Sequence, residues 1–150
     1  MKLAEALNLR ADLNRRIEQL RTRLLQNAKV QEGEVPLEPP QDLLAELDDC
    51  VSQLEELITK INLANARIKD EKGETMTAML ARRDAMEVRL SVLRQFANEA
   101  GSLIMRHGAS EIVIRSTVDM RRLRREIDDR SKDLRELNTK IQAINWTTDI

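Results

Sequence analysis

Aromatic side chains are almost absent from this sequence, since Trp146 and Phe96 are the only two among 150 residues and there is no tyrosine. Glycine and proline are also scarce, with four and three residues. Both residue types interrupt helices, so their scarcity beside a charged content of 34% is typical of long helices or coiled coils. The composition therefore predicts a mainly α protein of one domain.

Cysteine and histidine occur once each, as Cys50 and His107. A single cysteine excludes an intrachain disulfide and a multi-cysteine metal site, and four scattered glycines cannot form a phosphate-binding loop. No zinc-ligand spacing or Glu-x-x-His motif is present. The sequence thus predicts no catalytic residues, no metal site and no cofactor. Cys50 and His107 are the candidate reactive side chains, and the alternatives are a thiol in the core or an interface and a histidine in a surface loop.

Long apolar runs are missing too. Nothing approaches the roughly 20 apolar residues that a membrane-spanning helix needs. The first 16 residues contain Glu5 and Asp12 and lack the continuous apolar core of a signal peptide. We therefore expect a cytoplasmic protein.

Charge of one sign is not in excess, because 25 basic and 26 acidic residues give a formal net charge of −1. This balance provides no general attraction to nucleic acid. The segment MRRLRREIDDR, residues 120–130, is locally basic, but acids follow within a helical turn and no aromatics are interleaved for base stacking. It predicts intrachain ion pairs and no nucleic-acid partner.

What the sequence does contain is helical periodicity. Apolar residues at spacings of three and four predict helices over residues 2–28, 41–69, 75–106 and 119–145, with 29–40 as a linker. Thr75 and Asp119 are the expected N-caps of the last two helices. The stripe of the second helix is expected to run through Leu44, Leu47, Val51, Leu54, Ile58, Ile61, Asn65 and Ile68. Short turns favour antiparallel neighbours, so the prediction is a bundle of four long helices that resembles a coiled coil.

One segment, residues 110–118, has a different pattern. Ile112, Ile114 and Val118 lie on one side in the period of two that is typical of a strand. Polar residues lie on the other side, which only Val113 interrupts. A strand needs a partner, and the other extended candidate is the segment 28–35. The expectation is a short β-hairpin between these segments within one chain, or a strand paired across a subunit interface.

Three arginines fall where the helical stripes require apolar residues: Arg10, Arg83 and Arg130. An unpaired buried charge is strongly unfavourable. One interpretation is a polar layer or an anion-binding site inside the bundle. The alternatives are that the aliphatic stems cover apolar surface while the guanidinium groups reach solvent, or that the arginines face a second subunit.

The two ends of the chain carry a resemblance. The opening residues up to NAKVQEGE, the pair EIVIRSTVD before the last helix, and the closing LNTKIQAINWTTDI resemble the septicolysin-like family of small bacterial proteins. The resemblance extends over essentially the whole chain. It implies a haemolysin or cytolysin by name, and it implies no catalytic residues. Membranes would be partners only if that name describes the activity.

The leading functional prediction is a non-enzymatic helical protein that self-assembles, as a homo-oligomer, or binds a partner. The alternatives are a septicolysin-like cytolysin and a small-molecule or anion-binding protein that uses the three arginines. Trp146 lies four residues before the end of the chain, where a free tail has no need of an indole. We predict that it closes the end of the bundle or fills a subunit interface, with a functional aromatic platform as the alternative.

Overall fold

The computed structural model describes residues 1–102 and 113–150, which form four α-helices. They are α1 (Leu3–Gln26), α2 (Pro40–Arg67), α3 (Met76–Gly101) and α4 (Met120–Thr147). The mainly α prediction is confirmed. Every helix end lies within two residues of its predicted position except that of α3, which ends at Gly101 instead of residue 106.

The two expected N-caps are confirmed. The hydroxyl of Thr75 accepts a hydrogen bond from the amide of Ala78 at 3.1 Å. The carboxylate of Asp119 accepts from the amides of Arg121 and Arg122 at 3.0 and 3.2 Å. These side chains satisfy amides that have no partner within the first turn of a helix, which fixes where α3 and α4 begin.

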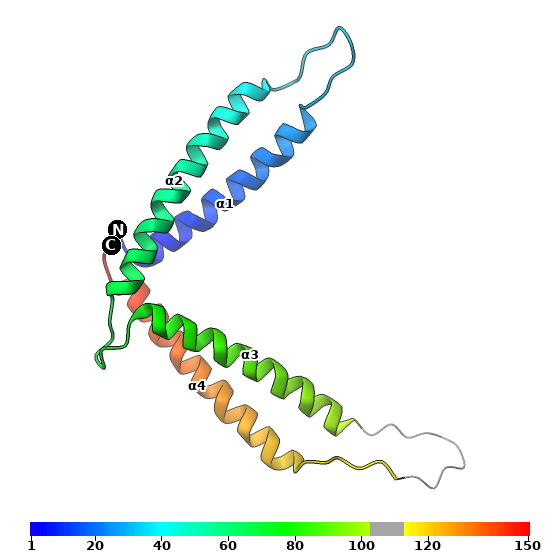
Figure 1. The fold of residues 1–150 in the computed structure, drawn as a ribbon, viewed down its shortest axis with the longest axis vertical. Coiled ribbons are helices and arrows are strands. Elements are labelled where there is room, and N and C mark those ends of the chain that lie inside the picture. The colour runs from blue at the N-terminus through cyan, green and yellow to red at the C-terminus, as the bar shows by residue number, and fades with distance from the viewer. Residues whose placement is uncertain (103–112) are drawn as a thin grey trace.

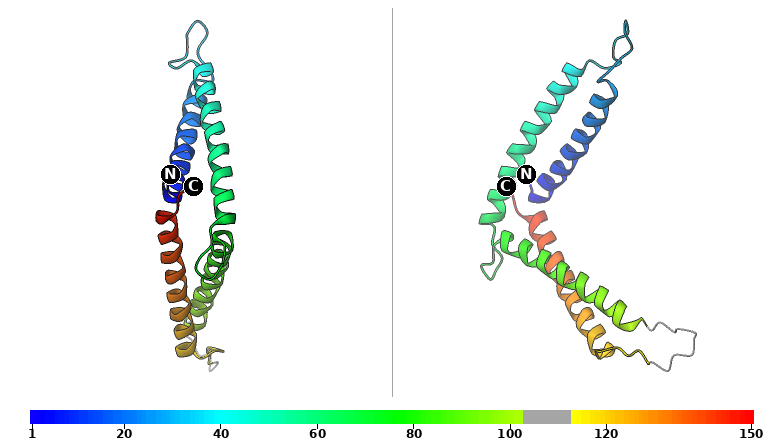
Figure 2. Two further views of the ribbon diagram at one scale, coloured as in Figure 1. Left: turned by 90° about the vertical axis from the view of Figure 1, so that its left-hand side faces the viewer. Right: turned by 45° about the vertical axis from the view of Figure 1, so that its right-hand side comes forward.

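The helices pair as two antiparallel hairpins that diverge from a common vertex (Figure 1). We call α1 with α2 arm A and α3 with α4 arm B. The vertex consists of residues 1–3, 68–76 and 147–150, and both chain termini lie there (Figure 1). Figure 2 shows the same open arrangement from two other directions. The predicted antiparallel pairing therefore holds within each arm, while the described parts of the two arms contact each other around the vertex.

The core runs along the seam of each arm and continues through the vertex. Its largest fully buried side chains are spread over all four helices: Leu3, Leu20, Ile61, Met76, Met79, Leu90 and Ile141. In α2 the buried residues are Leu43, Cys50, Leu57, Ile61 and Ala64. The prediction is confirmed for Ile61, whereas Leu44, Val51 and Ile58 are exposed and lie one position after the buried residues. A helix with a single helical neighbour buries only one narrow side, and the adjacent apolar positions remain outside.

The two arms are equivalent halves of an internal repeat. Helices α2 and α4 both have 28 residues and begin 80 positions apart, at Pro40 and Met120. The segment Lys60-Ile61 followed by Asn65 matches Lys140-Ile141 followed by Asn145 at the same offset. At the vertex, the amide of Leu3 donates to Thr148 and the amide of Met76 donates to Ile68, both at 2.9 Å. The two arms therefore share the length of their second helix, matching residues and the same backbone bond at the vertex.

The predicted β-hairpin is wrong for the described residues. Segment 28–35 lies at the tip of arm A, and residues 113–118 belong to the connection at the tip of arm B (Figure 1). The chain folds as two successive hairpins, so the two segments are at opposite extremes of the molecule. Within the described ranges the only strand-like pairs are the isolated bridges Lys2–Asp149 and Lys69–Thr75. Ile112 lies outside the described residues.

Candidate functional site

The vertex brings together the most distant parts of the sequence. The amide of Ile150 donates to the carbonyl of Met1 at 2.9 Å, beside the bond from Leu3 to Thr148. The ammonium group of Lys2 contacts the carboxylate of Asp149 at 2.7 Å and the carbonyl of Thr147 at 3.2 Å. The hydrogen bond from Lys2 lowers the pKa of Asp149. These contacts tie the end of the chain to its beginning.

On the other side of the vertex, Asp70 organises the turn between α2 and α3. Its carboxylate accepts from the amides of Lys72 and Glu74 at 2.9 and 2.8 Å, and from the ammonium group of Lys140 at 2.7 Å. Lys140 also contacts Glu71 at 2.8 Å. The side chain of Asp70 is only 1% exposed. The hydrogen bond from Lys140 lowers the pKa of Asp70 and raises that of Lys140, so both groups are ionised at neutral pH.

The Asp70 network therefore links the turn after arm A to the last helix of arm B. Every buried polar side-chain atom of the described residues has a hydrogen-bond partner. The Asp70 carboxylate already accepts three hydrogen bonds from within the fold, so we assign this network a structural role.

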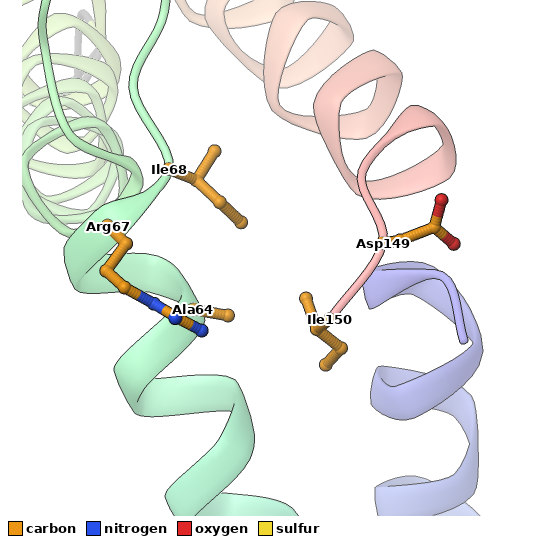
Figure 3. Close-up of a pocket in the computed structure, with 5 residues that line it drawn as sticks. All are labelled: Ala64, Arg67, Ile68, Asp149 and Ile150. Atoms are coloured by element: carbon orange, nitrogen blue, oxygen red, sulfur yellow. The ribbon is translucent and has the colours of Figure 1, made fainter.

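A pocket of about 280 Å³ lies at the vertex between the end of α2 and the C-terminal segment (Figure 3). It is lined by Ala64, Arg67, Ile68, Asp149 and Ile150. The side chain of Ile150 points toward α2, whereas the carboxylate of Asp149 points away from the gap (Figure 3). The lining combines the guanidinium group of Arg67 with the apolar side chains of Ala64, Ile68 and Ile150.

The three candidate arginines do not converge. Arg10 lies on arm A, while Arg83 and Arg130 lie half-buried on arm B. The guanidinium of Arg94 donates to the hydroxyl of Ser131 at 3.0 Å, which fixes the register of α3 against α4. In that register Arg83 and Arg130 are about 12 residues, or roughly 18 Å, apart along the arm.

Two of these arginines have local acidic partners. Arg83 contacts Asp84 at 2.8 Å, and Arg130 contacts Glu126 at 3.0 Å. Both pairs leave the guanidinium groups at the edge of the seam, in agreement with side chains that lay their stems on apolar surface. The geometry does not assemble a common anion site from the three arginines.

The candidate reactive side chains are also separate. Cys50 is buried in the seam of arm A, where it occupies a core position of α2. His107 lies outside the described residues. Among the described residues there is no group of three or more histidine, cysteine, aspartate or glutamate side chains that could hold a metal ion.

Trp146 is 57% exposed in the single chain, so the indole does not close the vertex by burial. The backbone bonds of Thr148 and Ile150 pin the terminus instead. The placement of Trp146 in a subunit interface stays a prediction. Ile114 is exposed near the tip of arm B and lines, with Phe96 and Thr117, a pocket of about 210 Å³.

No helix in the described part of the chain combines the length and the apolar character that crossing a membrane requires.

Two features of the structure were missed from the sequence. The first is the Asp70–Lys140 pair, for which the only local signal is an aspartate three residues before a turn glycine, Gly73, with a φ of 83°. The second is an apolar row outside the core of α2, formed by Leu44, Val51 and Ile58. Its seven-residue spacing is visible in the sequence, but it merges with the core stripe one position away.

Comparison with known proteins gives two matches. A family model, DUF6847, described as a family of unknown function, matches residues 10–150. The crystal structure of a functionally unknown conserved protein from Corynebacterium diphtheriae superposes with a TM-score of 0.91 at 36% sequence identity, covering 99% of this chain and 97% of that one. No protein with a curated description matches the chain.

Proposed function

The chain belongs to the DUF6847 family, whose function is unknown, and on this premise we propose that it acts through self-association of its helical arms. The proposal describes a non-enzymatic protein whose working form contains more than one copy. The observation that carries it is the amount of surface that the single chain leaves exposed.

The accessible surface of the chain is 11614 Å² for a mass of 17.3 kDa. The scaling law for folded monomers gives about 7,800 Å² at this mass. The single chain therefore exposes roughly half as much surface again as a compact monomer. Two separate arms produce this excess, because each helix is covered by a single neighbour over most of its length.

The ten residues outside the description do not account for the excess. Even as a fully unfolded segment, ten residues of about 1.1 kDa would contribute only about 1,600 Å². About 2,200 Å² then remains, which is comparable to the total area buried in large or obligate protein interfaces.

The exposed surface also contains large apolar side chains in rows. Leu44, Val51 and Ile58 on α2 are 48%, 46% and 38% exposed, and Val88, Val92 and Phe96 form a second row on α3. Scattered exposed apolar residues are ordinary, but rows along a helix favour contact with another protein surface. The pairing of two-helix arms into four-helix units is a common way to cover such rows.

Size-exclusion chromatography with light scattering tests the proposal. We expect a mass that is an integral multiple of 17.3 kDa at micromolar concentration and a decrease toward 17.3 kDa on dilution. A mass of one chain at every concentration up to about 100 μM, a weak association on the usual affinity scale, would contradict it.

The cytolytic activity implied by the septicolysin-like resemblance remains a separate prediction. Lysis of erythrocytes by the purified protein measures it directly, and its outcome is independent of the mass measurement.

A further inference from the structure

The internal repeat provides a built-in comparison for the row on α2. At the offset of 80 residues, Leu44, Val51 and Ile58 correspond to Arg124, Ser131 and Asn138 on α4. The two sets occupy the same place in equivalent hairpins. Since arm B folds with polar residues at these positions, the hairpin itself does not require apolar side chains there. The apolar row on arm A is therefore surplus to the fold and indicates a contact outside the chain.

The row lies on one defined flank of arm A. On the opposite flank, Arg16 contacts Glu46 at 2.7 Å across the α1–α2 seam. Positions 44, 51 and 58 fall on the other side of the seam by the 100° advance of an α-helix per residue. In arm B the equivalent flank is polar, and it is marked by the hydrogen bond from Arg94 to Ser131. We call the flank of arm A that carries Leu44, Val51 and Ile58 the apolar flank.

Charge indicates what covers the apolar flank. Helix α2 contains six acidic and two basic residues, a net charge of −4. Helix α1 contains five basic and three acidic residues, a net charge of +2. If two arms A meet face to face about a two-fold axis parallel to the helices, α2 of one copy lies on α1 of the other. This arrangement places opposite charges beside the apolar contact and keeps all neighbouring helices antiparallel.

The size of the flank also fits a stable contact between two copies. A 28-residue helix is about 42 Å long, and two helices side by side are about 20 Å wide. The side of arm A that contains the apolar flank therefore covers roughly 800 Å² on each copy. This is the area per partner in an interface of standard size.

From these observations we infer that arm A is the self-association arm, and that two copies pair through their apolar flanks with α2 of each against α1 of the other. Arm B has the same fold but does not take part in this contact. The inference rests on the proposed self-association and adds to it the surface, the symmetry and the partner, which is a second copy of this chain.

Matched double variants test the inference. Leu44→Gln with Ile58→Gln alters the apolar flank, and Arg124→Gln with Asn138→Gln alters the equivalent places on arm B. Glutamine is a good helix former and all four positions are outside the core, so both variants should retain the helical circular dichroism of the wild type. In sedimentation equilibrium we expect the dissociation constant of the dimer to rise at least 30-fold for the arm A variant and less than threefold for the arm B variant.

The outcomes separate the inference from the proposal on which it rests. A wild-type protein that is monomeric throughout overturns both. A wild-type oligomer that the arm A variant leaves intact overturns the assignment of the surface and leaves self-association standing. An equal loss in both variants contradicts the distinction between the arms.

Thiol reactivity identifies the occupant independently of the affinity. In Val51→Cys the new thiol should react with a soluble maleimide at least tenfold more slowly above the dissociation constant than below it, while the rate of Ser131→Cys should not depend on protein concentration. Buried Cys50 is present in every variant, and its slow reaction with the maleimide is measured in the wild type and subtracted. A concentration-independent rate at position 51 in a dimeric protein means that something other than a second copy covers the flank, and would overturn the inference.

Discussion

Arms A and B have the same backbone plan and different surfaces. Each is an antiparallel pair of long helices that starts and ends at the vertex, and the buried seam of one repeats in the other, as with Ile61 and Ile141. Their charges differ: α2 has a net charge of −4, whereas α4 contains eight basic and five acidic residues, a net charge of +3.

This difference shows which residues the fold requires. Positions that are apolar in both arms, such as Leu57 and Leu137, define the seam. Positions that are apolar in only one arm, such as Val51 opposite Ser131 in the repeat, are free of that requirement. An internal repeat thus separates the needs of folding from the needs of association without any other sequence for comparison.

The largest effects are expected in the seam, where the arms should respond equally. Ile61→Ala and Ile141→Ala each remove a buried side chain at equivalent positions, and each should lower the free energy of unfolding by about 3 kcal/mol, the centre of the usual range for such substitutions. Urea unfolding followed by circular dichroism measures both at a fixed protein concentration. If one costs more than twice the other, the two seams are not equivalent in energy.

A smaller effect is expected at the junction between the ends of the chain. This junction repeats the covalent turn between α2 and α3, but it is held only by non-covalent bonds. Deletion of residues 145–150 removes the bonds of Thr148 and Ile150 and the contact of Asp149 with Lys2. The melting temperature should fall by several degrees, since each kilocalorie of lost stability corresponds to about 2–4 °C at this chain length.

Trp146→Ala is the matched control for that deletion, because the indole is largely exposed in the single chain. It should change the melting temperature of the monomer little. A fall as large as that of the deletion would mean that the indole, and not the backbone, holds the terminus.

The sequence allowed the helices, their caps and their antiparallel pairing to be predicted, since these depend on local periodicity and on side chains such as Thr75 and Asp119. It did not allow the separation into two arms to be predicted, because a stripe shows that a helix has a covered side and not how many neighbours cover it. Along α2 the predicted stripe was right at Ile61 and one position away from the buried residues at Val51, for the same reason. Val51 and Cys50 are adjacent, and periodicity alone does not distinguish a buried seam from an apolar flank.

The candidate site was harder to predict than the fold. Arg10, Arg83 and Arg130 were grouped because each interrupts a stripe, but sequence spacing does not show at which level of an arm a residue lies. Asp70 and Lys140 are in contact although 70 residues separate them in the sequence, and only the internal repeat could have indicated this contact. Matching Lys60-Ile61 to Lys140-Ile141 would have placed the ends of α2 and α4 together at one vertex.

The smallest and most specific effect concerns the carboxylates at the two junctions. Asp70 is 1% exposed and bonded to Lys140, whereas Asp149 is 69% exposed and bonded to Lys2. Both pKa values are lowered in the folded protein, so each carboxylate stabilises the fold above its unfolded pKa, and this stabilisation is lost as the pH falls through the folded pKa. Solvent weakens the exposed pair more.

Asp70→Asn should therefore lower the melting temperature at pH 7 more than Asp149→Asn does. The difference between Asp70→Asn and the wild type should diminish as the pH falls below the usual range of an aspartate, near 4, toward the lower pKa of the folded state. Melting curves between pH 7 and pH 3 measure both. If Asp70→Asn lowers the melting temperature by the same amount at every pH, the lost charge is not the cause. The ion pair between Asp70 and Lys140 would then not be the contact that joins the turn after arm A to the last helix of arm B.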